Sequence, residues 1–240
     1  MAAAVDTERF LRDLDELREI GRYKTGVHRP TYSPQDMESR RWLMARMEEC
    51  GLEPAMDGIG NVLGRHRGPG PHLLVGSHIE TQSHAGWLDG ALGVVAGLAL
   101  ARAGLPVDVV AFADEEGHFE GGFLGSRSAI GALAEEEIDR SRNRTDGTPL
   151  RDALAAAGLA GLPRMTLDRD RYRGFLEMHI EQGTQFQPRL ALLRAQRGLE
   201  PLAHAPVLLA PVRDVGQREL DDLGQRRLAQ HEPHRAVLVD

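Results

Sequence analysis

Three short apolar segments constrain the fold of this chain most strongly. Each of them ends in polar residues or just before them. They are residues 73–75, 107–112 and 174–180. Apolar runs of this length indicate short buried strands. The intervening segment 91–103 is rich in Gly and Ala, which is typical of a helix packed tightly against a sheet. Strands that alternate with helices in this way predict an α/β fold.

The polar residues at these strand ends are histidines and carboxylates. His78 and Asp89 lie in the loop after the first strand, Glu115 and Glu116 follow the second, and His179 lies at the end of the third. In an open α/β sheet, ligands gather outside the carboxyl ends of the strands, so these side chains are expected to lie together. Two histidines and two or three carboxylates are a ligand set for a pair of zinc-like ions that share a bridging carboxylate.

The motifs around these residues point to one family. GSHIE and LDG lie within residues 76–90, DEEG at 114–117, GSR at 125–127 and HIEQG at 179–183. In this order they resemble the dinuclear zinc amidohydrolases related to aminoacylase and glutamate carboxypeptidase. The resemblance is greatest to the branch that holds N-carbamoyl-L-amino-acid hydrolase, allantoate amidohydrolase and β-ureidopropionase. It covers about residues 6–186 and implies a zinc-exopeptidase-like three-layer α/β/α sheet.

The resemblance also implies roles for the individual residues. Asp89 would bridge two divalent ions, with His78, Glu116 and His179 as further ligands, and Glu115 would be the general base. Zinc is the expected metal, with manganese, nickel or cobalt as alternatives. Metal-activated water would cleave a linear amide C–N bond of an N-carbamoyl amino acid or a ureido acid such as allantoate, while Glu115 takes a proton and returns it to the leaving nitrogen.

Two further residues are assigned through the resemblance. Gln182 matches a position that contacts the substrate in the carbamoyl-hydrolase branch; as an ordinary residue it would be a polar loop cap. Glu80 stands where the family usually has Asp, which orients the preceding histidine, and its side chain is one methylene longer. We expect Glu80 to support His78 from behind in the same way.

Each predicted ligand has an ordinary interpretation when it is taken alone. His78 reads as a polar loop residue, Asp89 as a helix N-cap, the DEEG sequence as a solvated acidic turn, and His179 as a core histidine. Only their combination in the family order favours a metal centre. Among their neighbours, Asp114 is expected to be a solvated charge, and four histidines are expected to be bystanders or surface residues: His66, His72, His84 and His118.

The chain also shows signals for its other elements. Helices are expected over residues 6–20, from Ser33-Pro34 to Gly51, and over 91–103. Two short strands joined by residues 57–60 are expected within 52–66, and shorter helices over 126–133, 135–140 and from Thr148-Pro149 to Gly158.

Composition excludes several classes of partner. The net charge of −7 does not favour nucleic acid or an anionic membrane. No apolar run approaches the about 20 residues that a membrane span needs, and the N-terminus lacks the pattern of a signal peptide. The single cysteine, Cys50, has no partner for an internal disulfide. We therefore expect a cytoplasmic protein with a small-molecule substrate.

The composition changes after residue 186. Ten residue types that occur 43 times in residues 1–186 are absent from the last 54: Ser, Thr, Asn, Ile, Lys, Met, Cys, Phe, Trp and Tyr. All codons for these types begin with A or T. Lys24 is the only lysine among 29 basic residues, which indicates a GC-rich gene. In such a gene a frame slip leaves only codons that begin with G or C.

We therefore hypothesise a frame break near Phe186 or Gln187. Residues 1–186 would form the first part of a metal-dependent catalytic domain, and 187–240 an out-of-frame, disordered tail. The alternative is a helical tail rich in Arg, Leu and Ala. Relatives of this family are longer, with an inserted dimerisation domain and a last histidine ligand that have no recognisable counterpart here, and they form homodimers.

This incompleteness limits the expected activity. The chain is expected to bind metal weakly and to show little or no hydrolysis. Two other functions remain open: a dipeptidase or aminoacylase of the same clan, and a non-catalytic truncated fragment.

Overall fold

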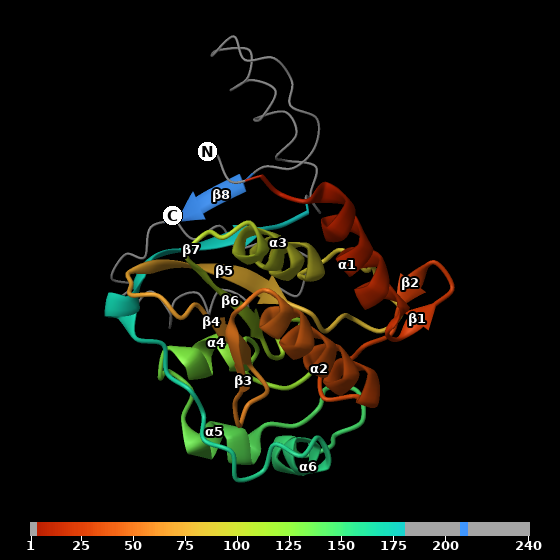
Figure 1. The fold of residues 1–240 in the computed structure, drawn as a ribbon. Helices are drawn as coiled ribbons and strands as arrows, with labels where there is room; N and C mark the ends of the chain where they lie inside the picture. Colours follow the sequence, from red (N-terminus) through yellow and green to blue (C-terminus); the bar gives the residue numbers. More distant parts are fainter. Residues whose placement is uncertain (1–3, 181–206, 211–240) are drawn as a thin grey trace, which may run out of the picture.

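A six-stranded mixed sheet forms the centre of the molecule (Figure 1). The computed structural model describes residues 4–180 and 207–210. The strand order is β3-β4-β6-β5-β7-β8, in which β5 pairs in parallel with β6 and β7, and the outer pairs are antiparallel. The bounds are β3 Glu53–Met56, β4 Val62–Arg65, β5 His72–His78, β6 Val107–Phe112, β7 Tyr172–Met178 and β8 Val207–Ala210. A separate hairpin joins β1 (Arg22–Tyr23) and β2 (Gly26–Val27).

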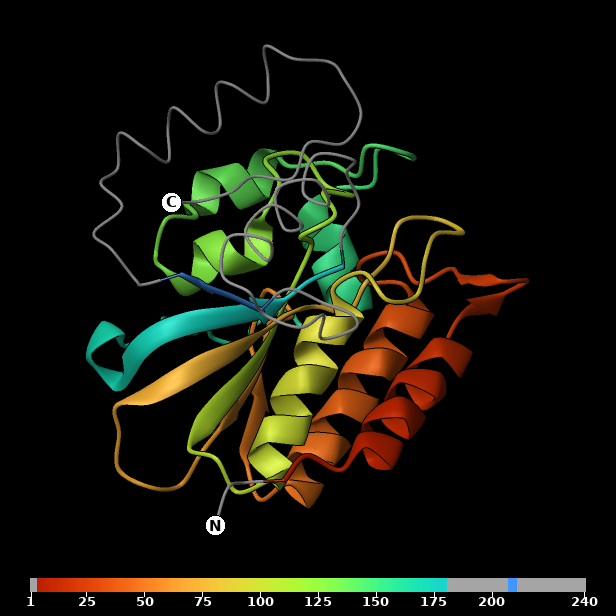
Figure 2. The same ribbon diagram turned by 90° about the horizontal axis from the view of Figure 1, so that it is seen from above.

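Three helices run side by side against one face of this sheet (Figure 2). They are α1 (Thr7–Glu19), α2 (Pro34–Glu49) and α3 (Ala91–Arg102). Side-chain caps set two of the starts: Asp6 accepts a hydrogen bond from the Arg9 amide at 2.9 Å, and Ser33 accepts one from the Asp36 amide at 3.1 Å. The main hydrophobic core lies between these helices and the sheet.

Helix α3 packs closest to the sheet because it carries small residues on the contact face. A Cβ atom at Gly93 would lie 2.9 Å from the carbonyl oxygen of Met178 and 3.0 Å from the Cβ of Ser77. This closeness holds the start of α3, and therefore Asp89 just before it, beside the ends of β5 and β7.

Three short helices gather apart from α1, α2 and α3, below the sheet in the view of Figure 1. They are α4 (Leu124–Ala129), α5 (Glu135–Arg140) and α6 (Leu150–Ala156), and a second apolar cluster that includes Phe119 and Ile138 holds them together. A one-turn 3-10 helix, Arg169–Arg171, precedes β7. Among the described residues, no helix combines the length and the apolar character needed to cross a membrane.

The predicted α/β fold with a central sheet is confirmed, with shifts at several boundaries. The first strand extends from residue 72 to 78, the third ends at Met178, and the helix expected over 126–133 spans Leu124–Ala129. The expectation that His72 lies at the surface is wrong. Its side chain is buried, with its ring against that of His66 and its Nε2 atom 3.2 Å from the Gly68 carbonyl oxygen.

The predicted division at residue 186 lies largely outside the described residues. Beyond Ile180 the structure describes Val207–Ala210 alone, as strand β8 antiparallel to β7. The frame-break hypothesis and the two-part division stay predictions.

Alanine at Gly90 is expected to destabilise the chain more than alanine at Gly104. The two glycines flank α3 and have positive φ angles of 67° and 79°, so either change adds about 1 kcal/mol of backbone strain. At Gly90 the new Cβ would also lie 2.5 Å from the His78 ring, whereas at Gly104 no atom of the described residues lies within 4 Å. Such overpacking adds about 1–3 kcal/mol. Urea unfolding of both variants measures the difference, and equal losses of stability would contradict the expectation.

Candidate functional site

The carboxyl ends of β5, β6 and β7 meet at one edge of the sheet, beside the start of α3. His78 is the last residue of β5 and pairs in register with Phe112, the last residue of β6. Continued along the strands, the pairing of Val75 with Leu176 places His179 level with His78. The structure therefore brings the predicted residues to a common edge, as parallel pairing requires.

His78 is held from one side and faces carboxylates on the other. Its side chain is 2% exposed. The Nδ1 atom lies 3.0 Å from the main-chain carbonyl oxygen of Glu80, which can only accept, so Nδ1 carries the proton. The Nε2 atom lies 3.5 Å from Oε2 of Glu115 and 3.9 Å from Oδ1 of Asp89. When His78 is neutral, this tautomer leaves the Nε2 lone pair available to bind a cation.

His179 repeats this arrangement on the other side of Asp89. Its Nδ1 atom donates to the carbonyl oxygen of Ile180 at 2.7 Å, and its Nε2 atom lies 2.9 Å from Oδ1 of Asp89. The hydrogen bond to Asp89 raises the pKa of His179 to about 9, against the opposing effect of burial. In the metal-free chain at neutral pH, a proton therefore joins His179 to Asp89.

Glu115 lies in surroundings that disfavour its charged form. Loss of solvation raises its pKa to about 7; the carboxylates of Glu80, Glu116 and Glu177 add to this rise, and His78 opposes it. A carboxyl group that titrates near neutrality can both accept and release a proton under physiological conditions.

Glu116 contacts a residue that sequence reasoning missed. The side-chain amide of Gln82 donates to the Glu116 carbonyl oxygen at 2.7 Å and lies 3.3 Å from its Oε2 atom. Burial raises the pKa of Glu116. Gln82 lies within the 76–90 stretch, but nothing in its type or spacing distinguished it there.

Glu177, near the end of β7, is a carboxylate that sequence reasoning also missed. It lies two residues before His179, and its charge helps to raise the pKa of that histidine. It accepts a hydrogen bond from the hydroxyl of Ser77 on the neighbouring strand. The signal that could have found it is the period of two along the strand, counted back from His179.

Glu80 and Asp114 are both buried beside the site. Glu80 contacts His78 through its main-chain oxygen, and its carboxylate lies 4.0 Å from Nδ1. The expectation that Asp114 is a solvated charge is wrong, because it is fully buried and accepts hydrogen bonds from the amides of His118 and Phe119 at 2.9 and 3.3 Å. Asp114 thus closes the turn that carries Glu115 and Glu116. Gln182 lies outside the described residues.

The histidines and carboxylates of the site are the residue types that bind divalent metals, but their side chains are not arranged around a common point. Within residues 4–180 and 207–210, no three His, Cys, Asp or Glu side chains are placed to hold an ion as they stand. Two of the histidine–carboxylate pairs share Asp89, whose Oδ1 faces the Nε2 atoms of His78 and His179. Imidazole nitrogens around a shared carboxylate suit zinc and similar ions, and main-chain carbonyls already fix both rings in the tautomer such ligands need.

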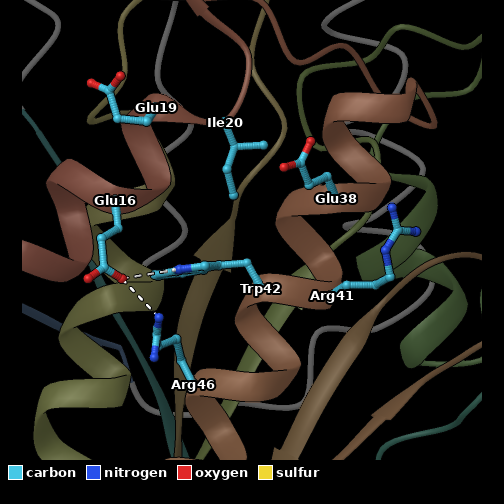
Figure 3. Close-up of a pocket in the computed structure, with 7 residues that line it drawn as sticks. All are labelled: Glu16, Glu19, Ile20, Glu38, Arg41, Trp42 and Arg46. Carbon is cyan, nitrogen blue, oxygen red and sulfur yellow. Dashed lines mark hydrogen bonds and ion pairs between the residues drawn. The ribbon is translucent and has the colours of Figure 1, made fainter.

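A hollow elsewhere on the surface is not part of this site. Figure 3 shows it between α1 and α2, and none of the predicted site residues lines it. Among its lining residues, Glu16 lies 3.1 Å from Arg46 and 3.4 Å from the indole nitrogen of Trp42. These contacts indicate a surface groove between packed helices.

Replacement of His179 by Gln is expected to lower the stability of the metal-free chain at low pH more than at high pH. The folded pKa of His179, about 9, lies above its ordinary value near 6.5, so its ion pair stabilises the fold fully below about pH 6.5 and is lost as the pH rises through about 9. Urea unfolding with a chelator, at about pH 6 and about pH 10, measures the difference between wild type and variant. A difference that is equal at both pH values would contradict this assignment.

Comparisons with known proteins match most of the chain. An N-carbamoyl-L-amino-acid amidohydrolase from Paenarthrobacter aurescens is 37% identical over 185 residues, which cover 70% of this chain and 45% of that relative. An allantoate amidohydrolase from Escherichia coli is 38% identical over 173 residues, which cover 66% and 41%. The chain spans about half the length of the curated relatives it matches.

Comparison of the fold with solved structures agrees with the sequence comparisons. The crystal structure of an amidase of the hydantoinase/carbamoylase family from Burkholderia phymatum superposes with a TM-score of 0.74 and 48% identity, covering 78% of this chain and 48% of that one. No family model matches the chain. By sequence and by structure, the matched region of this chain is therefore homologous to the N-carbamoyl-L-amino-acid and allantoate amidohydrolases of the hydantoinase/carbamoylase family.

Proposed function

We propose that this chain carries the catalytic residues of a metal-dependent amidohydrolase that cleaves the linear amide C–N bond of an N-carbamoyl amino acid or a ureido acid. The observation that carries the proposal is the arrangement around Asp89. Two imidazoles present Nε2 to its Oδ1 atom, at 3.9 Å from His78 and 2.9 Å from His179. The relatives are named for activity on N-carbamoyl-L-amino acids or allantoate, and this supports the substrate class.

Four residues would hold the metal: His78, Asp89, Glu116 and His179. When bound there, a zinc-like ion lowers the pKa of water and polarises the scissile carbonyl. We propose that two divalent ions would bind, with zinc as the expected metal, and that Asp89 would be a ligand of both. Glu116 would exchange its contact with Gln82 for this role.

Glu115 would serve as the general base. Its Oε2 atom lies 3.5 Å from Nε2 of His78, so it borders the group of proposed ligands. With a pKa of about 7, it can take a proton from the attacking water and return it to the leaving nitrogen near neutral pH. Gln182 would contact the substrate.

Zinc titration of the 240-residue chain tests the metal proposal. Asp89→Asn is expected to weaken zinc binding by about 100-fold or more, beyond the about 10–100-fold that loss of an outer partner costs. Glu115→Gln is expected to leave the affinity nearly unchanged, because the base is not a ligand. A competition assay with a zinc-binding dye measures both. Equal affinities for wild type and Asp89→Asn would contradict the proposal.

The same Glu115→Gln variant is expected to be more stable than wild type above about pH 7 in a chelator. The folded pKa of Glu115, about 7, lies above its ordinary value near 4.3, so ionisation destabilises the fold fully above about pH 7 and not at all below about pH 4. Urea unfolding at both ends of this range measures the effect. Glu120→Gln, at an exposed carboxylate outside the site, is the control and should change little.

Product analysis tests the substrate class. N-carbamoyl amino acids and allantoate are the expected substrates, and their hydrolysis is followed by ammonia release. An N-acetyl amino acid and a dipeptide distinguish the other activities of the clan, and their hydrolysis is followed by release of the free amino acid. Any hydrolysis by this chain should fall about 100-fold or more in Glu115→Gln. Hydrolysis that survives in that variant would contradict the role of Glu115.

A further inference from the structure

A buried ionic network connects helix α2 with the candidate site. Arg40 on α2 is fully buried. Its Nε atom donates to Asp36 at 3.0 Å, one Nη atom donates to the carbonyl oxygen of Gly60 at 2.7 Å, and the other donates to Glu80 at 3.1 Å. One guanidinium thus links its own helix, the turn between β3 and β4, and the segment after β5.

Glu80 continues the network into the site through both its side chain and its main chain. One carboxylate oxygen accepts from Arg40, and the other accepts from the main-chain amide of Glu115 at 2.6 Å. Its main-chain oxygen accepts from Nδ1 of His78 at 3.0 Å. The placement of Glu80 therefore determines the positions of the strand end that carries Glu115 and of the His78 ring.

Arginine suits this position better than lysine for geometric reasons. Its planar fork directs donors to three fixed acceptors at once, whereas an ammonium group is a single point on a flexible stem. Asp36 is itself held in place, because the Tyr32 amide donates to it at 2.8 Å. The network is thus anchored at the start of α2, away from the strand ends.

We propose that Arg40 is a positioning residue of the candidate site, which acts through Glu80 on the Glu115 main chain and on His78. This inference rests on the proposed function for the roles of Glu115 and His78, but the contacts themselves do not depend on it. The carboxylate of Glu80 accepts from Arg40 and from the Glu115 amide, and it also lies 4.0 Å from Nδ1 of His78.

Hydrogen exchange at the Glu115 amide of the metal-free chain tests the proposal. In Arg40→Lys, exchange at Glu115 should speed up about tenfold or more relative to Val109 in the core of β6, because a charge-assisted acceptor is no longer fixed. Zinc affinity should fall as well, by about tenfold or more. A merely structural role would speed exchange at Glu115 and Val109 by the same factor.

Arg171→Lys is the matched control. Arg171 contacts Asp108, a fully buried carboxylate near the start of β6, at 2.6 and 3.0 Å. This variant breaks a comparable ion pair at the opposite end of the strand that leads to Glu115. It should lower overall stability without a selective effect on the Glu115 amide or on zinc affinity.

Glu80→Gln keeps the test decisive if Arg40→Lys does not fold. This variant leaves Asp36 and Arg40 as a balanced pair, and its amide oxygen should turn to the charged Arg40, so the Glu115 amide loses its acceptor. If hydrogen exchange speeds up at the Glu115 amide more than at the Val109 amide, the proposal is supported. If exchange at the Glu115 amide is no faster than in Arg171→Lys, the proposal is overturned. If the wild-type chain binds no zinc, the proposed function fails, while the exchange results still decide the role of Arg40.

Discussion

The parallel pairing of β5 with β6 and β7 is the constraint on which the rest of the site depends. Parallel strands end at the same edge, so a histidine after one and glutamates after another meet without any long excursion of the chain. The close approach of α3, allowed by Gly93, adds Asp89 to the same edge. Changes in strand order would separate these groups even if every side chain were kept.

Electrostatics then determines how the gathered groups behave. Several carboxylates near one another, partly removed from water, raise one another's pKa values. The structure compensates unevenly: His179 contacts Asp89, Arg40 is shared by Asp36 and Glu80, and within the described part of the chain the ion-pair contact of Glu115 is with His78. Loss of solvation, with the neighbouring carboxylates adding to it, raises the pKa of Glu115 to about 7.

Sequence reasoning recovered the strands and the residues at their ends because both leave local signals. Apolar runs marked β5, β6 and β7, and Ser33-Pro34 marked the start of α2. It did not recover Gln82, the burial of Asp114 or the connection through Arg40, because these depend on contacts between distant segments. Arg40 and Glu80 are 40 residues apart, and neither has a spacing that indicates its partner.

Asp36 has two structural roles at once, and this affects how natural sequence variation at its position should be interpreted. The same carboxylate receives the Tyr32 amide at the start of α2 and the Arg40 guanidinium in its second turn. Substitutions at this helix start are therefore not neutral surface changes, although they lie on a different element from every proposed ligand. In a comparison of homologous chains, residues linked to the site through buried charges should therefore vary less than other residues at the same distance from the substrate.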